Sequence, residues 1–187
     1  MAKVKILVEG FTNADNPDAE EEKTCATITL IKDRSLNIIV DPGVLDSQNI
    51  LIEKLKQEGL TVDDIDIVAL THSHIDHYRN IGMFPGAKTL EYFGLWDGGV
   101  ADDWEEDFTD DIKIIKTPGH NYDALTFLVK TDEGTVAVVG DVFWREGLPE
   151  HDPYASDEKR LKRSREEVLK LADYVIPGHG PMFKVKK

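Results

Sequence analysis

Residues 71–77 read Thr-His-Ser-His-Ile-Asp-His and gather three histidines and one aspartate on a single short segment. Imidazole nitrogens and carboxylate oxygens are the ligands that borderline divalent ions such as zinc prefer. A structural core has no reason to collect so many of them, and a solvated polar loop rarely spaces them as His-x-His-x-Asp-His. The stretch therefore predicts a metal site and, with it, a metalloenzyme.

This histidine-rich stretch follows residues 65–70, a short apolar run that is typical of a strand. The same order, an apolar run and then a ligand-type side chain, recurs at residues 112–116 with His120, 135–140 with Asp141, and 174–176 with His179. Because loops at strand ends are where folds present their chemistry, we expect these strand ends to converge on one site. The candidate metal ligands are His72, His74, Asp76, His77, His120, Asp141 and His179. They are too many for one tetrahedral zinc and suit two metal ions about 3.5–4 Å apart.

The remaining pattern is mixed α and β. Residues 24–31 and 36–40 flank a turn-forming stretch and predict a β-hairpin. Amphipathic helices are predicted from Ser47 to Gly59 and onward from Asp157. Further strands are expected in residues 1–10 and 125–129, and a surface loop in residues 11–23. A length of 187 residues fits one domain spanning 1–187.

Composition limits the classes of partner. The formal net charge of −14 repels polyanions at long range, so nucleic-acid binding is not expected. No apolar run is long enough to cross a bilayer, the N-terminus has no signal-peptide core, and the lone Cys25 cannot form an internal disulfide. We therefore expect a cytoplasmic protein with a small-molecule substrate and no membrane partner, while the sequence leaves its oligomeric state open, a homodimer included.

The ligand pattern resembles that of metallo-β-lactamase-fold hydrolases. Residues 72–77, His120, Asp141 and His179 match the metal motifs of that superfamily in order. The framing pieces are similar as well, namely Asp41-Pro42-Gly43, Thr117-Pro118-Gly119, Gly140 and Pro177-Gly178 with Gly180, so the resemblance covers nearly the whole chain. It implies an α/β (α+β) fold, a four-layer αβ/βα sandwich of two mixed sheets with helices on the outer faces and metals at one edge.

The resemblance also implies roles for the ligands, in a set similar to that of glyoxalase II. His72, His74 and His120 hold one metal, Asp76, His77 and His179 hold the other, and Asp141 bridges them. Two Zn²⁺ ions are the expected cofactors, with iron or manganese as alternatives. A hydroxide between the metals is then the nucleophile, since two cations lower the pKa of bound water toward neutrality. We hypothesise that Asp76, beside that hydroxide, is also a catalytic proton acceptor.

Departures from particular members of the superfamily narrow the substrate. Asp141 stands where the commonest zinc β-lactamases have a cysteine ligand, so antibiotic hydrolysis is not expected. Lactonases that open acyl-homoserine lactones have a tyrosine soon after the bridging aspartate, whereas residues 142–145 here read Val-Phe-Trp-Arg. The first hypothesis is hydrolysis of an ester, thioester or lactone carbonyl in a small molecule. The alternatives are a metal-dependent phosphodiesterase or ribonuclease and, third, a mononuclear iron persulfide dioxygenase.

Other polar and aromatic residues have simpler explanations. His151 lies outside every motif and is expected at the surface, and Arg145 is expected in an exposed ion pair, although it is close enough to Asp141 to contact an anionic substrate. Tyr122 either packs on the next strand or reaches the substrate. Residues 91–111 carry nine acidic and no basic side chains together with several aromatics, and form either a lid or a surface insertion whose aromatics pack on the domain.

Overall fold

The computed structural model describes residues 1–147 and 149–186. Its strands are β1 Lys3–Val8, β2 Phe11–Thr12, β3 Thr24–Cys25, β4 Ile28–Asp33, β5 Leu36–Val40, β6 Ile67–Ala69, β7 Lys88–Glu91, β8 Gly94–Asp97, β9 Val100–Asp102, β10 Ile112–Lys116, β11 Leu125–Thr131, β12 Gly134–Gly140, β13 Tyr174–Pro177 and β14 Phe183–Lys184. The helices are α1 Gln48–Gln57, α2 Ile75–Tyr78 and α3 Glu158–Leu171, with short 3₁₀ turns at Val62–Asp64 and Ile81–Met83.

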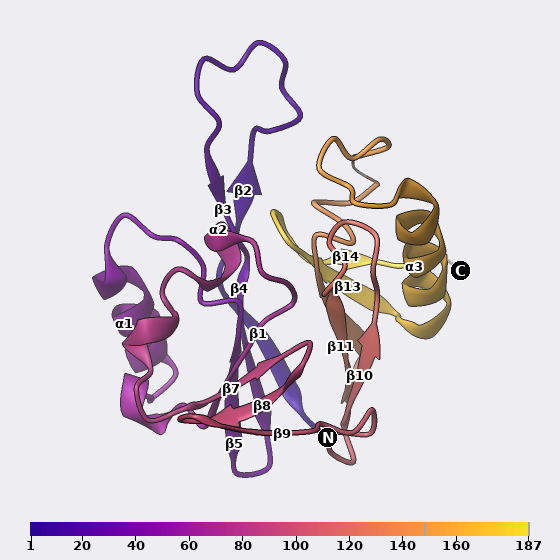
Figure 1. Cartoon of the computed structure of the whole chain (residues 1–187). Coiled ribbons are helices and arrows are strands. Elements are labelled where there is room, and N and C mark those ends of the chain that lie inside the picture. Colours follow the sequence, from indigo (N-terminus) through magenta and orange to yellow (C-terminus); the bar gives the residue numbers. More distant parts are fainter. Residues whose placement is uncertain (148, 187) are drawn as a thin grey trace.

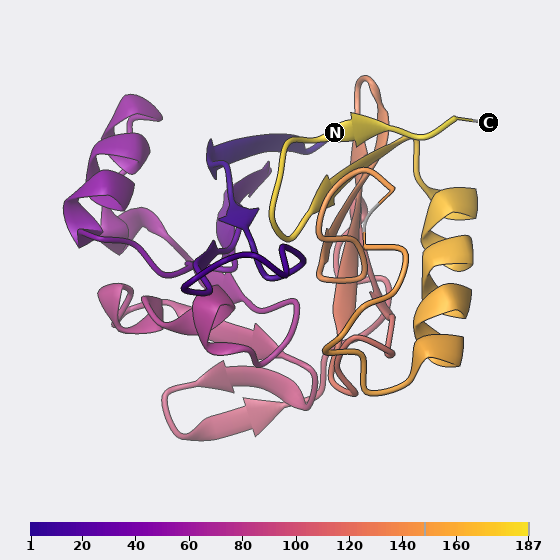
Figure 2. The ribbon, with the colours of Figure 1, turned by 90° about the horizontal axis from the view of Figure 1, so that it is seen from above.

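Two sheets pack face to face between two helices, as Figures 1 and 2 show. One sheet has the strand order β1-β4-β5-β6-β7-β8-β9 and the other β10-β11-β12-β13-β14. Apolar side chains from both sheets, among them Val40, Leu125 and Ile176, form the core between them. Helix α1 covers the outer face of the first sheet through Leu51 and Leu55. The predicted four-layer αβ/βα sandwich is confirmed.

Helix α3 covers the outer face of the second sheet. Its buried side chains include Leu161 and Val168, which share an apolar cluster with Val139 and Val175 of that sheet. Asp157 caps its N-terminus by accepting hydrogen bonds from two backbone amides, and Ser47 caps α1 by accepting one from the Asn49 amide. Both predicted helix starts are confirmed. No helix among residues 1–147 and 149–186 is both long and apolar enough to cross a membrane.

Strand directions bring the predicted ligands to one edge. Both β10 and β12 run antiparallel to β11, and β13 runs parallel to β12, so these three strands point the same way. Their carboxyl ends carry His120, Asp141 and His179. The loop after β6, in the opposite sheet, brings residues 71–74 and helix α2 to the same edge, which lies below the β2–β3 hairpin in Figure 1. The expected convergence of strand ends is therefore observed.

The predicted strand at residues 24–31 is wrong in one respect, because the structure divides it between two sheets. Residues of β3 pair with β2 in a two-stranded sheet, and β4 pairs with β1 and β5. Between them the Thr27 amide leaves the ladder and donates to the carbonyl of Gly178, 2.6 Å away. Apolar periodicity cannot reveal this break, because the residues on both sides of it are buried.

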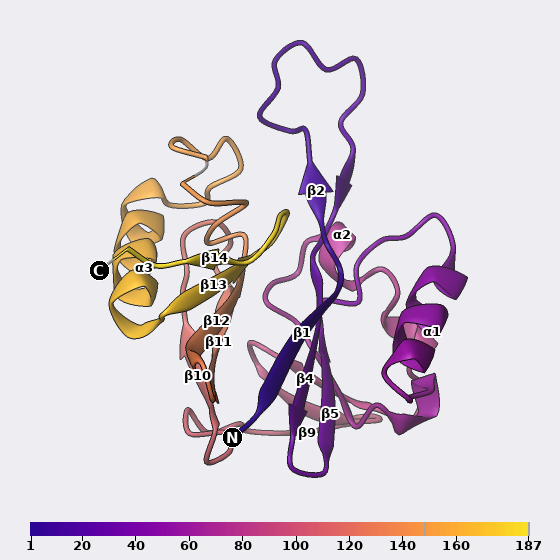
Figure 3. The same ribbon diagram turned by 180° about the vertical axis from the view of Figure 1, so that it is seen from behind.

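The predicted surface loop at residues 11–23 begins with β2 and continues as the loop of a β2–β3 hairpin. This hairpin extends beyond the sandwich on the side of the predicted ligands, as Figures 1 and 3 show. The acidic segment 91–111 forms the β8–β9 hairpin and a following strap, and Tyr92, Trp104 and Phe108 pack against the core between the sheets. The packing alternative for these aromatics is the one observed.

Candidate metal centre

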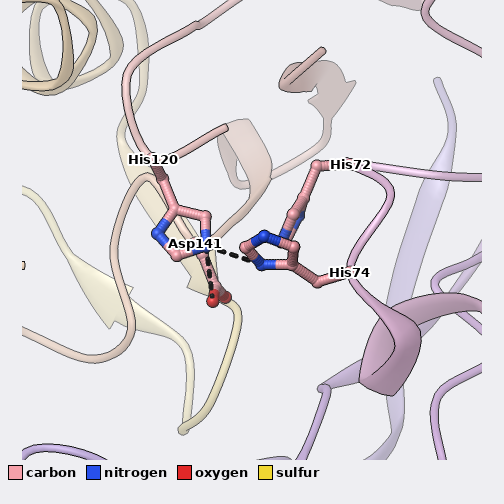
Figure 4. A group of neighbouring side chains, drawn as sticks. All are labelled: His72, His74, His120 and Asp141. Carbon is pink, nitrogen blue, oxygen red and sulfur yellow. Dashed lines mark hydrogen bonds and ion pairs between the residues drawn. The ribbon is translucent and has the colours of Figure 1, made fainter. Parts of the chain in front are cut away.

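Three of the predicted ligands come together with Asp141 in a first cluster, shown in Figure 4. His72 and His74 lie in the loop after β6, and His120 approaches from the turn after β10. The Nε2 atom of His120 is 3.0 Å from Nδ1 of His74 and 3.4 Å from Oδ2 of Asp141. One donor atom from each of the four residues lies within 4.8 Å of the others, a separation that a single cation can span.

A second cluster adjoins the first and consists of Asp76, His77 and His179. Asp76 and His77 belong to the single turn of α2, and His179 follows β13. One carboxylate oxygen of Asp76 is 3.8 Å from Nε2 of His77 and 3.7 Å from Nε2 of His179. The described chain therefore brings all seven predicted ligands to one edge of the sandwich, in two adjoining groups.

Asp141 lies between the two clusters. Its Oδ1 is 3.3 Å from His77 and 3.2 Å from His179, while its Oδ2 is 3.4 Å from His120. Three buried atoms here have no hydrogen-bond partner among the described residues, namely Nε2 of His72, Nε2 of His77 and Oδ1 of Asp141. Because orphaned buried polar atoms are rare and costly, a donor set that converges in this way fits bound cations.

Asp41 holds His77 from behind and was not identified as a functional residue from the sequence. Its Oδ2 accepts a hydrogen bond from Nδ1 of His77 at 2.8 Å, and its two oxygens also accept from the amide and hydroxyl of Thr71. The side chain is almost fully buried, and its backbone has a φ of 52°, a conformation that non-glycine residues seldom adopt. The Asp41-Pro42-Gly43 motif was the available signal in the sequence. Because its aspartate binds Nδ1 of His77, Nε2 of that histidine stays free for a metal.

Asp152 plays the equivalent part for His120, and no sequence pattern pointed to it. Its Oδ2 accepts from Nδ1 of His120 at 2.7 Å, and its Oδ1 accepts from the Tyr154 amide at 2.9 Å. Neighbouring His151 is exposed and pairs with Glu158, as predicted for a surface histidine. Carboxylate partners of this kind fix the tautomer and orientation of a metal-binding imidazole.

The second cluster is also positioned by β3. The carbonyl of Cys25 lies 3.0 Å from Nδ1 of His179, and the Thr24 hydroxyl donates to Oδ2 of Asp76 at 2.8 Å. Cys25 itself is buried, and that burial raises the pKa of its thiol, in keeping with an inert core cysteine. The two residues of β3 thus orient two ligands that come from distant parts of the chain.

Two glycines permit the close approach of these segments. Gly140 has a φ of 52°, and a β-carbon there would lie 2.2 Å from the hydroxyl of Thr71. A β-carbon at Gly178 would lie 1.8 Å from Oδ1 of Asp141. Any side chain at either position would displace a ligand loop, which explains why glycine precedes both Asp141 and His179.

Burial and neighbouring charges set the protonation of the metal-free cluster. Burial lowers the pKa of His72 well below its usual range and also lowers that of His74. Burial disfavours the charge on His77 too, but Asp141 and Asp41 outweigh it and raise the His77 pKa well above the ordinary value. Burial likewise opposes ionisation of Asp141, yet His179 and His77 hold its pKa well below the usual range. A proton near His77 thus occupies the place that a cation would take.

A cavity of about 270 Å³ opens beside both clusters. The cluster residues that reach it include Asp76, which is 13% exposed. The rest of its wall comes from the β2–β3 hairpin, α2 and the segment after β12, namely Thr12, Ala14, Glu22, Thr24, Ile75, Trp144 and Tyr154. A larger hollow of about 820 Å³ lies beside the acidic strap, and none of the predicted ligands lines it.

Predictions for one segment and two single residues are resolved here. No described residue of the segment 91–111 lines the cavity beside the clusters, so the lid alternative finds no support. Tyr122 is 59% exposed, so the alternative that it packs on the next strand is wrong, and it does not line that cavity, so the substrate-contact alternative finds no support. Arg145 forms the expected ion pair, but its partner is Asp15 of the β2–β3 loop.

The αβ/βα sandwich, with a histidine and aspartate cluster at its edge, defines a metal-binding hydrolase. The chain belongs to the metallo-β-lactamase superfamily, whose model matches residues 26–96. Metallo-beta-lactamase domain-containing protein 1 of Xenopus laevis is 34% identical over 98% of this chain and 82% of its own length. The human protein of that name is 36% identical over 79% of this chain, which spans 59% of the human protein. A probable metallo-hydrolase of Methanocaldococcus jannaschii is 34% identical over 98% of this chain and 90% of its own.

Solved structures agree on the fold. A Thermotoga maritima protein classed among the metallo-beta-lactamases has a TM-score of 0.77 and 26% identity, over 98% of this chain and 99% of its own. AidC, a dizinc quorum-quenching lactonase with a bound product, has a TM-score of 0.67 and 16% identity over 89% of this chain and 76% of its own. A protein solved in a di-iron-bound form has a TM-score of 0.66 and 20% identity over 86% of this chain and 90% of its own.

Proposed function

We propose that this protein is a dinuclear zinc hydrolase that cleaves an ester, thioester or lactone carbonyl of a small molecule. The observation that carries the proposal is the position of Asp141, within 3.4 Å of ligand nitrogens from both clusters. His72, His74 and His120 would hold one cation, Asp76, His77 and His179 would hold the other, and Asp141 would be shared between them. Nitrogen and carboxylate donors of this kind suit zinc, and iron or manganese remain possible occupants.

The chemistry that two bound cations supply is a hydroxide nucleophile at neutral pH and a Lewis acid for the carbonyl oxygen. The surrounding residues orient the side chains that would bind the metals. Asp41 and Asp152 hold His77 and His120 by their Nδ1 atoms, so that Nε2 of each faces the site. Trp144 is 2% exposed and covers the cluster from the side of His120 and His179. A buried wall of this kind excludes water and strengthens the electrostatic interactions inside.

Asp76 is the residue proposed to accept a proton during turnover. Its Oδ2 is held by the Thr24 hydroxyl, and it is the most exposed carboxylate of the two clusters. A carboxylate at the cavity surface can take a proton from the nucleophile and pass it to the leaving group. Asp76→Asn removes this capacity while keeping the side-chain volume. If that variant binds two metals and keeps full turnover, Asp76 has no proton-transfer role.

The cavity wall supports a carbonyl substrate over a phosphodiester. Its described lining residues include no lysine or arginine, and Glu22 adds a negative charge beside the clusters. Phosphodiesterases and nucleases use lysine and arginine side chains, in addition to their metals, to hold the phosphate groups of the substrate. The lactonase activity of the structural neighbour AidC is compatible with this choice, although that likeness concerns the fold. The second cluster, with its own three donors, supports two metals over the single iron of a dioxygenase.

Metal analysis of protein purified without added metal is the first test, and we expect two zinc ions per chain. One iron per chain would replace this proposal with oxygen chemistry. A substrate panel then compares aryl esters, a thioester and a γ-lactone with bis-p-nitrophenyl phosphate. Turnover of the phosphodiester with no turnover of the carbonyl substrates would identify a phosphodiesterase instead. The matched control is His151→Gln, an exposed histidine outside the clusters, which should leave metal content and turnover unchanged.

A further inference from the structure

Two aromatic rings form one wall of the cavity beside the metal clusters. Tyr154 stacks on Trp144 with ring centroids 6.0 Å apart and an interplanar angle of 26°. Trp144 is buried against His120 and His179, whereas Tyr154 is 48% exposed. The pair therefore runs from the ligands outward to the mouth of the cavity. Stacked rings of this kind offer a rigid apolar surface to part of a substrate.

The facing wall belongs to the β2–β3 hairpin. Two polar contacts join this hairpin to the segment after β12, which carries the aromatic wall. The Tyr154 hydroxyl donates a hydrogen bond to the carboxylate of Glu22, and Arg145 forms an ion pair with Asp15. Thr12 and Ala14 complete the hairpin side of the cavity. The part of a bound substrate that extends outward from the metal clusters along the aromatic wall therefore passes the Glu22 carboxylate.

The charge on this path is negative. Among the described lining residues outside the metal clusters, Glu22 is the charged one, and none is a lysine or arginine. Arg145 is outside the lining and is already paired with Asp15. The hydrogen bond to Glu22 raises the pKa of Tyr154, so the tyrosine hydroxyl stays neutral and adds no charge to the cavity.

Asp152 fixes the position of the aromatic wall relative to the metal clusters. The same buried carboxylate that orients His120 accepts a hydrogen bond from the backbone amide of Tyr154. Asp152 therefore links the orientation of His120 to the backbone position of Tyr154. A wall held in this way can select among substrates, because selection requires a fixed geometry.

We propose that Glu22, held across the cavity by Tyr154, is a specificity-determining residue that makes the site accept substrates with a neutral or cationic chain and reject those with an anionic chain. The inference rests on the proposed carbonyl hydrolysis and adds to it a substrate class. An anionic group beside Glu22 meets like charge, whereas an apolar chain gains contact with the Tyr154 ring and a cation also gains attraction to Glu22.

The test uses three p-nitrophenyl esters that share the leaving group and nearly the same chain length. They are the hexanoate, which is neutral, the adipate monoester, which ends in a carboxylate, and the 6-(trimethylammonio)hexanoate, which ends in a cation. The holoprotein is compared with Glu22→Gln, Tyr154→Phe and Glu20→Gln, the last a charge-matched control in the same loop that does not line the cavity. Metal content and thermal unfolding are measured for every variant, so that misfolding is recognised.

We expect the wild-type ratio of kcat/KM for hexanoate over adipate monoester to be about tenfold or more. Glu22→Gln should lower this ratio about tenfold, and it should also reduce the preference for the cationic ester. Tyr154→Phe keeps the Glu22 charge but removes the hydrogen bond that holds it, so it should lower the ratio by less than Glu22→Gln does. Glu20→Gln should match the wild type in all three reactions.

A binding measurement separates the two proposals. Saturation-transfer NMR with the matching primary amides reports on the same chain ends without turnover. If no ester is hydrolysed but Glu22→Gln still increases binding of the anionic amide relative to the neutral one, the proposed hydrolysis fails and the charge selection stands. If the esters are hydrolysed and the selectivity ratio is unchanged by Glu22→Gln in both measurements, the role of Glu22 is refuted and the hydrolase assignment is unaffected.

Discussion

Replacing Asp152 with asparagine tests how the site holds His120. Each oxygen of this carboxylate accepts one hydrogen bond, from Nδ1 of His120 at 2.7 Å and from the Tyr154 amide at 2.9 Å. The asparagine amide offers only one acceptor oxygen, so its NH₂ group must face the Tyr154 amide or Nδ1 of His120, and Nδ1 can accept from it only if the imidazole proton moves to Nε2, the atom that faces the metal site. The side chains of Asp152 and His120 are 0% and 2% exposed, so water cannot compensate.

This mismatch lowers both the stability of the metal-free protein and its affinity for metal. One buried N–H without an acceptor destabilises the metal-free protein by about 1–3 kcal/mol. Loss of the carboxylate also leaves the orientation and tautomer of His120 undefined, and outer carboxylate partners are worth about 10–100-fold in metal affinity. We therefore expect metal binding to weaken by about 1.4–2.7 kcal/mol, in addition to the change in unfolding free energy.

Two assays separate these effects. Denaturant unfolding of chelator-treated Asp152→Asn measures the stability of the metal-free fold, and competition with a chromophoric chelator measures metal affinity. The adjacent His151→Gln serves as the control, because His151 is 81% exposed and should change stability by less than about 0.5 kcal/mol. If Asp152→Asn matches the wild type in both assays, Asp152 does not position His120.

Two further predictions concern the same edge of the sandwich. Gly178→Ala should abolish metal binding at the second cluster, because the added β-carbon would lie 1.8 Å from Oδ1 of Asp141. Elemental analysis of the purified variant measures its metal content. A full metal content would contradict the packing argument. Metal affinity should rise with pH across neutrality by about tenfold per unit for each proton displaced, since Asp141 and Asp41 outweigh burial and raise the His77 pKa in the metal-free protein. Titration with zinc between pH 6 and pH 8 measures the slope, and a flat profile would mean that no proton leaves His77.

Much of the fold could be predicted from local patterns. Ser47 and Asp157 begin helices as expected, because a side-chain oxygen that accepts from the first free amides is a local device. The strand at Ile112–Lys116 was predicted with the bounds that the structure gives. The break within residues 24–31 was missed, because the change of sheet depends on the contact between Thr27 and Gly178, which are distant in sequence.

The candidate site shows the same division. A metal site can be recognised from the spacing of residues 72–77 without a structure, because structural cores and solvated loops rarely use such a pattern. Asp152 could not be recognised, since a lone aspartate in a loop carries no signal until the fold places it against His120. The cavity wall was likewise hidden, because Glu22 and Tyr154 are exposed side chains separated by 132 residues.

The sequence by itself determined the donor set, the strands and helices that carry it, and the superfamily to which the chain belongs. These are properties of residue type and short-range spacing, which the chain retains in any conformation. Only the tertiary structure decided that Asp141 lies between two clusters, that Asp41 and Asp152 stand behind the ligands, and that Glu22 faces the route into the site. Those relations arise when two sheets pack and strand ends from distant segments meet at one edge, and local sequence does not encode that packing geometry.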